Sequence, residues 1–197
     1  MALFWTTAGL KGRGRKPVLA LLTDNSPQDP LPAVRRLPPG SLVVLRFLKG
    51  EALPGYVPGL RRLCRERRLK FLVSSDWRLA ERLGADGLHL PEALASSGQL
   101  APCLGWMRRK PHLLLTAAAH SAKALARAAA MGADAALLSP VFTTQSHAGT
   151  KPLGPLRFAR LCRFARIPVL ALAGVNRRTA RYLAASGATG FAGVSGI

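Results

Sequence analysis

One short pattern occurs three times in the chain, each time where an expected helix gives way to an expected strand. It reads L-G-A-D-G at positions 83–87, M-G-A-D-A at 131–135 and S-G-A-T-G at 186–190. A glycine in this place ends a helix in the left-handed conformation. A small residue and a turn residue follow, and an apolar run then begins. The repeat therefore indicates a chain built from successive helix–strand units.

Short apolar runs bounded by turn residues recur along the whole chain, as buried strands do. The expected strands are 18–22, 41–47, 71–73, 86–90, 112–116, 135–138, 168–173 and 190–194. The expected helices are 29–37, 60–68, 76–83, 91–100, 121–131, 156–166 and 179–186. Strands that alternate with helices and are buried on both faces form a parallel sheet. We expect a closed (β/α)8 TIM barrel, with an open doubly wound sheet as the alternative.

The domain organisation follows from length and from the two ends of the chain. Residues 1–16 form a basic arm rich in glycine, lysine and arginine, and 17–197 suit a single barrel domain. The chain stops right after the eighth expected strand, so we expect the last outer helix to be absent or truncated. Leu3, Phe4 and Trp5 of the arm, or a partner subunit in a homo-oligomer, would then cover the apolar stripe.

Composition narrows the classes of partner. The chain has 29 Lys+Arg against 9 Asp+Glu, a net charge of +20 that favours anionic ligands. The basic residues are spread over the polar faces of the expected helices and follow no RNA- or DNA-binding motif, so we expect no nucleic-acid partner. No apolar run has the length of a membrane span, and no signal-peptide pattern is found, so we expect a cytoplasmic protein without membrane contact.

The three cysteines do not suggest a metal centre. Cys64, Cys103 and Cys162 are far apart and odd in number, and they match neither a zinc spacing nor a disulfide framework. We expect inert thiols.

The segment 139–154 (S-P-V-F-T-T-Q-S-H-A-G-T-K-P-L-G) is a long polar loop after the sixth expected strand. Loops of this length inside a compact domain are usually functional or disordered, so a mobile surface loop is the alternative. Its hydroxyl groups, including those of Thr144 and Ser146, lie beside His147 and Lys151 in the sequence. These side chains suit an anionic ligand.

A second candidate for anion binding comes from the ends of the last two strands. Active sites of (β/α)8 barrels lie at the carboxyl ends of the strands, and the loops after strands seven and eight commonly bind phosphate there. Gly174 follows the seventh expected strand, and Val194 and Ser195 end the eighth. Small residues let backbone amides approach a ligand closely. We therefore expect a cradle for a small-molecule phosphate at these residues.

Several motifs resemble the thiamine phosphate synthase/TenI family. They are G-A-D-G-L-H-L at 84–90, A-H-S at 119–121, S-P-V-F at 139–142, K-P-L-G at 151–154 and V-S-G-I at 194–197. The resemblance implies a (β/α)8 barrel that binds a thiazole phosphate or thiamine phosphate. Synthases of this family join a pyrimidine diphosphate to the thiazole phosphate with Mg²⁺, whereas TenI-type members isomerise a thiazole carboxylate phosphate.

The chain departs from the synthase pattern where the diphosphate and Mg²⁺ would bind. The family's Gln-x-Arg-x-Lys falls at Val44, Arg46 and Leu48, so that only the arginine is kept. The positions of its magnesium carboxylates and of a serine after the fifth strand are Ser74–Ser75, Ala93 (with Glu92 one place early) and Ala118. Mg²⁺ prefers carboxylate oxygens. We therefore expect no cofactor, and Mg²⁺ only if the protein is a working synthase.

The thiazole-phosphate half of the pattern is largely kept. His120 stands at the position of the TenI catalytic histidine, where a base near neutral pH is needed, although synthases often carry histidine there too. Thr144 and Ser146 match the family's Thr-x-Thr, and His147 replaces its lysine. We expect His89 to be structural and His112 to lie at the surface.

Four functions remain open on the sequence. The leading hypothesis is a TenI-like isomerase with His120 as catalyst, and with Arg46 and the cradle residues binding the phosphate ligand. A diverged thiamine phosphate synthase is the first alternative. A non-catalytic ligand-binding or regulatory protein that binds thiamine phosphate is the second, and nucleic-acid binding through the net charge of +20, the least favoured, is the third.

Overall fold

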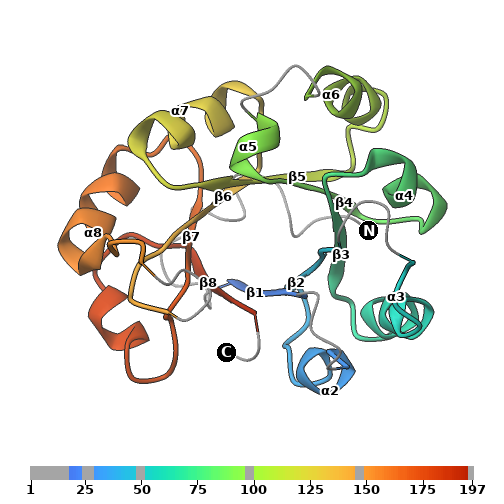
Figure 1. The fold of residues 1–197 in the computed structure, drawn as a ribbon, viewed down its shortest axis with the longest axis horizontal. Coiled ribbons are helices and arrows are strands. Elements are labelled where there is room, and N and C mark those ends of the chain that lie inside the picture. Colours follow the sequence, from blue (N-terminus) through green and yellow to red (C-terminus); the bar gives the residue numbers. More distant parts are fainter. Residues whose placement is uncertain (1–17, 24–28, 48–51, 96–99, 145–148, 195–197) are drawn as a thin grey trace.

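The chain folds into a closed ring of eight parallel strands with helices around the outside (Figure 1). The computed structural model describes residues 18–23, 29–47, 52–95, 100–144 and 149–194. Each strand pairs with the next along the chain, and β1 pairs with β8 to close the ring, for example at Leu19 and Phe191. The expected (β/α)8 barrel is confirmed, and the open doubly wound sheet is wrong.

The strands lie close to their expected places. Their bounds are β1 Val18–Leu22, β2 Leu42–Leu45, β3 Lys70–Ser74, β4 Gly87–Leu90, β5 Leu114–Ala119, β6 Ala135–Leu138, β7 Val169–Leu172 and β8 Gly190–Gly193. The helices are α2 Leu31–Val34, α3 Val57–Glu66, α4 Trp77–Arg82, α5 Glu92–Ala95, α6 Leu100–Arg108, α7 Ala122–Ala130 and α8 Gly154–Phe164, followed by the 3₁₀ helix η2 Ala180–Leu183.

The alternation of side chains along each strand divides the core into two layers. One set fills the barrel interior: Ala20, Leu22, Leu42, Val44, Leu72, Leu114, Ala135, Leu137, Leu170, Leu172 and Ala192. The neighbouring strand positions point outward and pack under the helices, as Val43 and Phe71 do. Both layers are apolar, which explains why the strands read as continuous apolar runs.

The repeated pattern has the structure that the sequence predicts, because its three glycines all have a positive φ, at 57° for Gly84 and 78° for Gly132 and Gly187. The residue two places later then joins the sheet. The backbone N–H of Asp134 donates to the carbonyl of Leu115, and the Asp134 carboxylate accepts the Leu115 N–H at 2.8 Å. Asp86 makes the same two bonds with Phe71. Each aspartate thus fixes the register of a new strand against its neighbour.

This geometry predicts how Asp134 affects stability. Burial raises the pKa of its carboxyl group, so its contribution is greatest below the unfolded-state pKa and is lost as pH rises through the raised folded value. Asp134→Asn keeps an acceptor for Leu115 without the charge, so it should be at least as stable as wild type at pH 7. Asp134→Ala leaves that N–H unpaired and should lower the free energy of unfolding by about 1–3 kcal/mol.

Urea unfolding at several pH values measures both variants. The difference in free energy of unfolding between Asp134→Asn and wild type should become smaller as the pH falls, because the wild-type carboxyl group becomes neutral. An asparagine variant less stable than the alanine variant at pH 7 would contradict this account.

Three expected helices differ from the structure. The helix expected over 29–37 is only the four-residue α2, Leu31–Val34. Both ends of the expected helix 91–100 are helical, at α5 and at Leu100 of α6, with 96–99 outside the described residues; the expected end at 100 is wrong, because α6 continues to Arg108. Pro102 and Gly105 are poor helix formers and obscure the helical pattern of α6. The helix expected over 179–186 is the short η2, where side chains of Asn176 and Thr179 bond backbone N–H groups instead.

The outer face of the β8–β1 pair is less covered than that of the other strands. Leu19 and Phe191 point outward there and are only half-buried. β8 is the last element in the described part of the chain, and the basic arm of residues 1–16, proposed as a cover, lies outside it. Within the described ranges, no helix has the length and apolar character needed to cross a membrane.

Candidate functional site

A polar layer closes the barrel interior at the carboxyl ends of the strands. His89 of β4 is buried, and its Nδ1 lies 3.0 Å from the Thr116 hydroxyl of β5. Burial, and then the positive charge of Arg46, lower the pKa of His89 to about 4. His89 therefore stays neutral at physiological pH, which agrees with its expected structural role.

Arg46 follows β2 and brings positive charge toward this layer. Its Nε donates to the carbonyl of Thr23 at 2.9 Å, and its backbone N–H donates to the Thr23 hydroxyl at 2.9 Å. These bonds join the ends of β1 and β2 and hold the guanidinium at the barrel mouth. A contact between Arg46 and a ligand stays a prediction.

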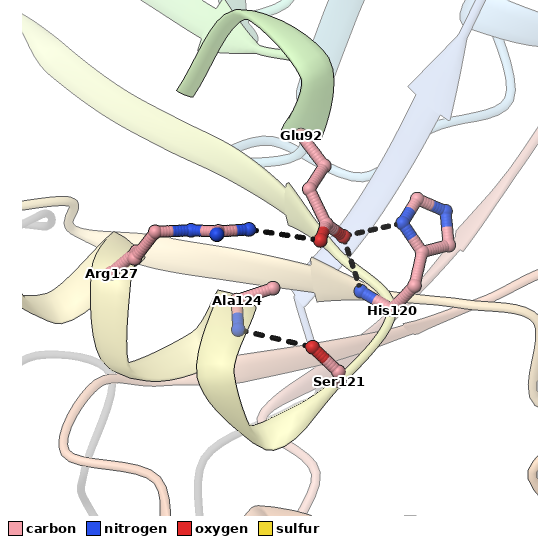
Figure 2. Close-up of polar contacts among 5 residues, drawn as sticks. All are labelled: Glu92, His120, Ser121, Ala124 and Arg127. Atoms are coloured by element: carbon pink, nitrogen blue, oxygen red, sulfur yellow. Dashed lines mark hydrogen bonds and ion pairs between the residues drawn. The ribbon is translucent and has the colours of Figure 1, made fainter. Parts of the chain in front are cut away.

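His120 belongs to a second polar group at the same end of the barrel (Figure 2). Its Nδ1 lies 2.6 Å from Oε2 of Glu92, and its backbone N–H donates to the same oxygen at 2.8 Å. The other oxygen, Oε1, accepts from Arg127 at 3.0 Å. The His120 side chain is 46% exposed and that of Glu92 24%, so the imidazole can meet a ligand while its partner is more shielded.

Local structure brings these three residues together. His120 directly follows β5, and Ser121 then caps α7 by accepting the N–H of Ala124 at 3.1 Å. Glu92 begins α5, just after the neighbouring strand β4. Because the ends of β4 and β5 are adjacent in the ring, Glu92 reaches His120 (Figure 2). Arg127 reaches Glu92 from α7.

The residues that would replace the synthase's magnesium ligands do not form a metal site. The hydroxyls of Ser74 and Ser75 lie 3.4 Å apart, and the Asp76 carboxylate caps α4 by accepting the N–H of Leu79. Glu92 is bound to His120 and Arg127. No group of three or more possible histidine, cysteine or acidic ligands occurs among the described residues. This donor set does not fit the Mg²⁺ of a synthase.

The loop after β6 meets the loop after β7 beside Gly174, one of the residues of the expected phosphate cradle. The N–H of Val141 donates to the carbonyl of Leu172 at 3.1 Å, and that of Phe142 to the carbonyl of Ala173 at 3.2 Å. Ala173 and Gly174 have positive φ values of 73° and 68°. The first residues of the loop after β6 are therefore hydrogen-bonded to the end of β7.

The cradle has amide groups available for an anion. In the described part of the chain, the backbone N–H groups of Gly174 and Val194 have no hydrogen-bond acceptor. Ala173 and Val194 both pack on the interior core, so the ends of β7 and β8 converge there. Thr144 is half-buried nearby along the loop, whereas Ser146, His147 and Ser195 lie outside the described residues.

Sequence reasoning missed two features. It treated Glu92 only as a misplaced magnesium ligand, although both Glu92 and His120 stand at the ends of neighbouring strands. It also gave no sign of a cavity of ≈ 440 Å³ outside the barrel, between α6 and α7, lined by Leu104, Met107 and Arg127 among others. This cavity lies apart from the barrel mouth.

The remaining histidine and cysteine predictions that the structure describes are confirmed. His112 is exposed. All three cysteines are free, and burial raises the pKa of the Cys64 and Cys162 thiols to about 12. Thiols with such values are not ionised at neutral pH and are poor nucleophiles.

The fold is a (β/α)8 barrel with two groups of polar side chains at the carboxyl ends of its strands. A family model described as thiamine monophosphate synthase (TMP-TENI) matches residues 41–197. The chain therefore belongs to the thiamine phosphate synthase/TenI family of thiamine biosynthesis, whose members bind phosphate-containing small molecules.

Individual relatives agree with this assignment. A thiamine-phosphate synthase from Chlorobium luteolum is 30% identical over 188 residues, which cover 92% of this chain and 85% of the relative. One from Bacillus velezensis is 25% identical over 184 residues, covering 89% and 80%. The structure of a thiamine phosphate pyrophosphorylase from Pyrococcus furiosus is similar with a TM-score of 0.71 and 25% identity, covering 90% of this chain and 85% of that one.

Proposed function

We propose that the protein isomerises a thiazole phosphate by proton transfer, as TenI-type members of its family do. One contrast carries the proposal. At the mouth of the barrel, His120 is kept and held by Glu92, while Ser74, Ser75 and Ala93 stand where a synthase has magnesium carboxylates. Proton transfer requires a positioned base and a phosphate anchor, and it does not require those carboxylates.

The phosphate anchor is the cradle. The amides of Gly174 and Val194 would donate to the phosphate, with Thr144, Ser146, His147 and Ser195 as further contacts. Backbone amides bind anions well where glycine permits close approach. Arg46 would add positive charge on the β2 side, and the net charge of +20 attracts phosphorylated ligands to the protein.

His120 would carry the proton. The imidazole accepts a proton from one atom of the bound thiazole system and returns a proton to another, so the composition of the ligand and the charge of the protein are unchanged at the end. An imidazole can act as both general base and general acid. The partial exposure of His120 leaves its ring accessible from the mouth of the barrel.

A direct assay tests the proposal. Purified protein is incubated with the thiazole carboxylate phosphate tautomer in the presence of EDTA, and the conversion is followed by chromatography. We expect conversion that is insensitive to the chelator, because no step uses a metal. Absence of both conversion and binding would refute the proposal.

A diverged synthase is the second candidate, and the names of the relatives favour it. Proteins named thiamine-phosphate synthase match across most of this chain. A synthase would form thiamine phosphate from the pyrimidine diphosphate and the thiazole phosphate only with Mg²⁺, and EDTA would stop it. The third candidate, a non-catalytic protein, would bind thiamine phosphate in the same cradle and convert neither set of substrates.

A further inference from the structure

We propose that Glu92 is the positioning residue of His120 and holds its imidazole with the proton on Nδ1. This inference deepens the proposed isomerase function and rests on it for its catalytic meaning. It assigns a role to a carboxylate that the sequence comparison with the family leaves without one, since the magnesium carboxylate falls at Ala93 and not at Glu92.

The geometry of one oxygen atom carries the argument. Oε2 of Glu92 accepts both the backbone N–H of His120, at 2.8 Å, and a bond from the ring Nδ1, at 2.6 Å. A carboxylate oxygen has no proton to donate, so Nδ1 must be the donor. In the neutral ring, the lone pair is then on Nε2, and Nε2 is the nitrogen that can accept a proton from a ligand. The double contact also restrains the ring relative to its own backbone.

Arg127 completes the arrangement. It donates to Oε1 at 3.0 Å, so both oxygens of Glu92 are engaged by N–H groups. His120, the helix cap Ser121 and Arg127 belong to one continuous segment, because α7 begins directly after Ser121. The same turn that places His120 at the barrel mouth therefore also places the cation that restrains its partner (Figure 2).

The N–H groups of His120 and Arg127 require a side chain whose two terminal atoms are both hydrogen-bond acceptors. Among its contacts with described residues, Glu92 accepts three N–H groups, two from His120 and one from Arg127. A glutamine at this position must turn its NH₂ group toward one side, where it faces N–H donors. If the NH₂ group faces His120, it is opposed to the backbone N–H of His120 and favours the tautomer with the proton on Nε2. If the NH₂ group faces Arg127, the glutamine side chain loses the hydrogen bond from Arg127 that restrains it. Glu92→Gln thus changes the chemistry with little change in volume.

The test reads the tautomer directly. The chain has 4 histidines, so ¹⁵N-histidine labelling and long-range ¹H–¹⁵N spectra can resolve each ring, and the spectrum of His120→Gln assigns the His120 signals. At a pH where the ring is neutral, wild type should show the proton on Nδ1. Glu92→Gln should move the population toward the Nε2–H form. In the tautomer assay, kcat should fall about 10–100-fold with KM nearly unchanged.

Glu81→Gln is the matched control. Glu81 is also a carboxylate that accepts a ring N–H, from Trp106, and pairs with Lys110, but it lies on α4 and away from His120. It should leave the His120 signals and kcat unchanged. A wild-type ring with its proton on Nε2, or a tautomer unaffected by Glu92→Gln, would overturn the inference. If wild type turns nothing over, the proposed function fails, while the NMR result still decides whether Glu92 positions His120.

Discussion

His120→Ala is expected to lower kcat for thiazole isomerisation by about 10²–10⁴-fold, the contribution of a positioned acid–base group. KM should change little, because the proposed phosphate cradle lies on the other side of the barrel mouth, at the ends of β7 and β8. The loss should be larger than that caused by Glu92→Gln, since the latter keeps an imidazole in place. Steady-state kinetics on the two variants measure both losses in kcat and show which is larger.

The variant should remain folded, which keeps the result interpretable. The His120 side chain is 46% exposed, and the cap of α7 depends on Ser121 and not on the histidine ring. His112→Ala is the matched control, because His112 is also exposed but precedes β5 at the opposite end of the barrel. Unchanged kcat in His120→Ala, with a normal unfolding curve, would remove His120 from the mechanism and assign the proton transfer to another group.

The fold could be predicted because its signals are local. Gly84, Gly132 and Gly187 each end a helical segment with a positive φ, and the next residues start a strand, so a few neighbours decide each unit. The apolar runs then require a sheet covered on both sides. The extension of α6 to Arg108 was missed for an equally local reason, since Pro102 and Gly105 are both poor helix formers.

The candidate site could be predicted only in part, because its contacts join distant segments. His120 stood out by its type and place, but its partner Glu92 lies 28 positions away in the sequence. The pair depends on the ends of β4 and β5 being neighbours and on the exact reach of a glutamate side chain. Ser146, His147 and Ser195 lie outside the described residues, so their contacts with a phosphate stay predictions.

Gly174→Ala is expected to distort the proposed cradle strongly, although the substitution adds only one carbon atom. A Cβ at Gly174 would lie 2.6 Å from Cβ of Phe142 and 2.8 Å from the carbonyl oxygen of Thr143. These two atoms are a backbone oxygen and a Cβ of a loop that is hydrogen-bonded to the end of β7. Moving them would therefore cost free energy. The positive φ of 68° adds strain of about 1–2 kcal/mol for a residue with a Cβ, and overpacking adds about 1–3 kcal/mol more.

Gly40→Ala separates these two effects. Gly40 also has a positive φ, of 86°, but a Cβ there would meet no atom within 4 Å. Its variant should therefore lose only the strain contribution in urea unfolding, and it should bind ligand normally, since Gly40 precedes β2 at the end of the barrel opposite the cradle. The difference in unfolding free energy between the two variants measures the collision at Gly174.

Gly174→Ala should also weaken ligand binding, because the added Cβ displaces the loop after β6. Displacing Phe142 and Thr143 would move the segment that leads to Thr144, and the strain at Gly174 would shift its backbone amide. We expect the affinity for thiazole phosphate, measured by calorimetry, to fall at least about tenfold, which corresponds to about 1.4 kcal/mol. Affinity equal to that of Gly40→Ala would show that the phosphate lies elsewhere on the barrel. A selective loss in Gly174→Ala would instead tie ligand binding to the junction of the β6 and β7 loops, independently of whether His120 turns the ligand over.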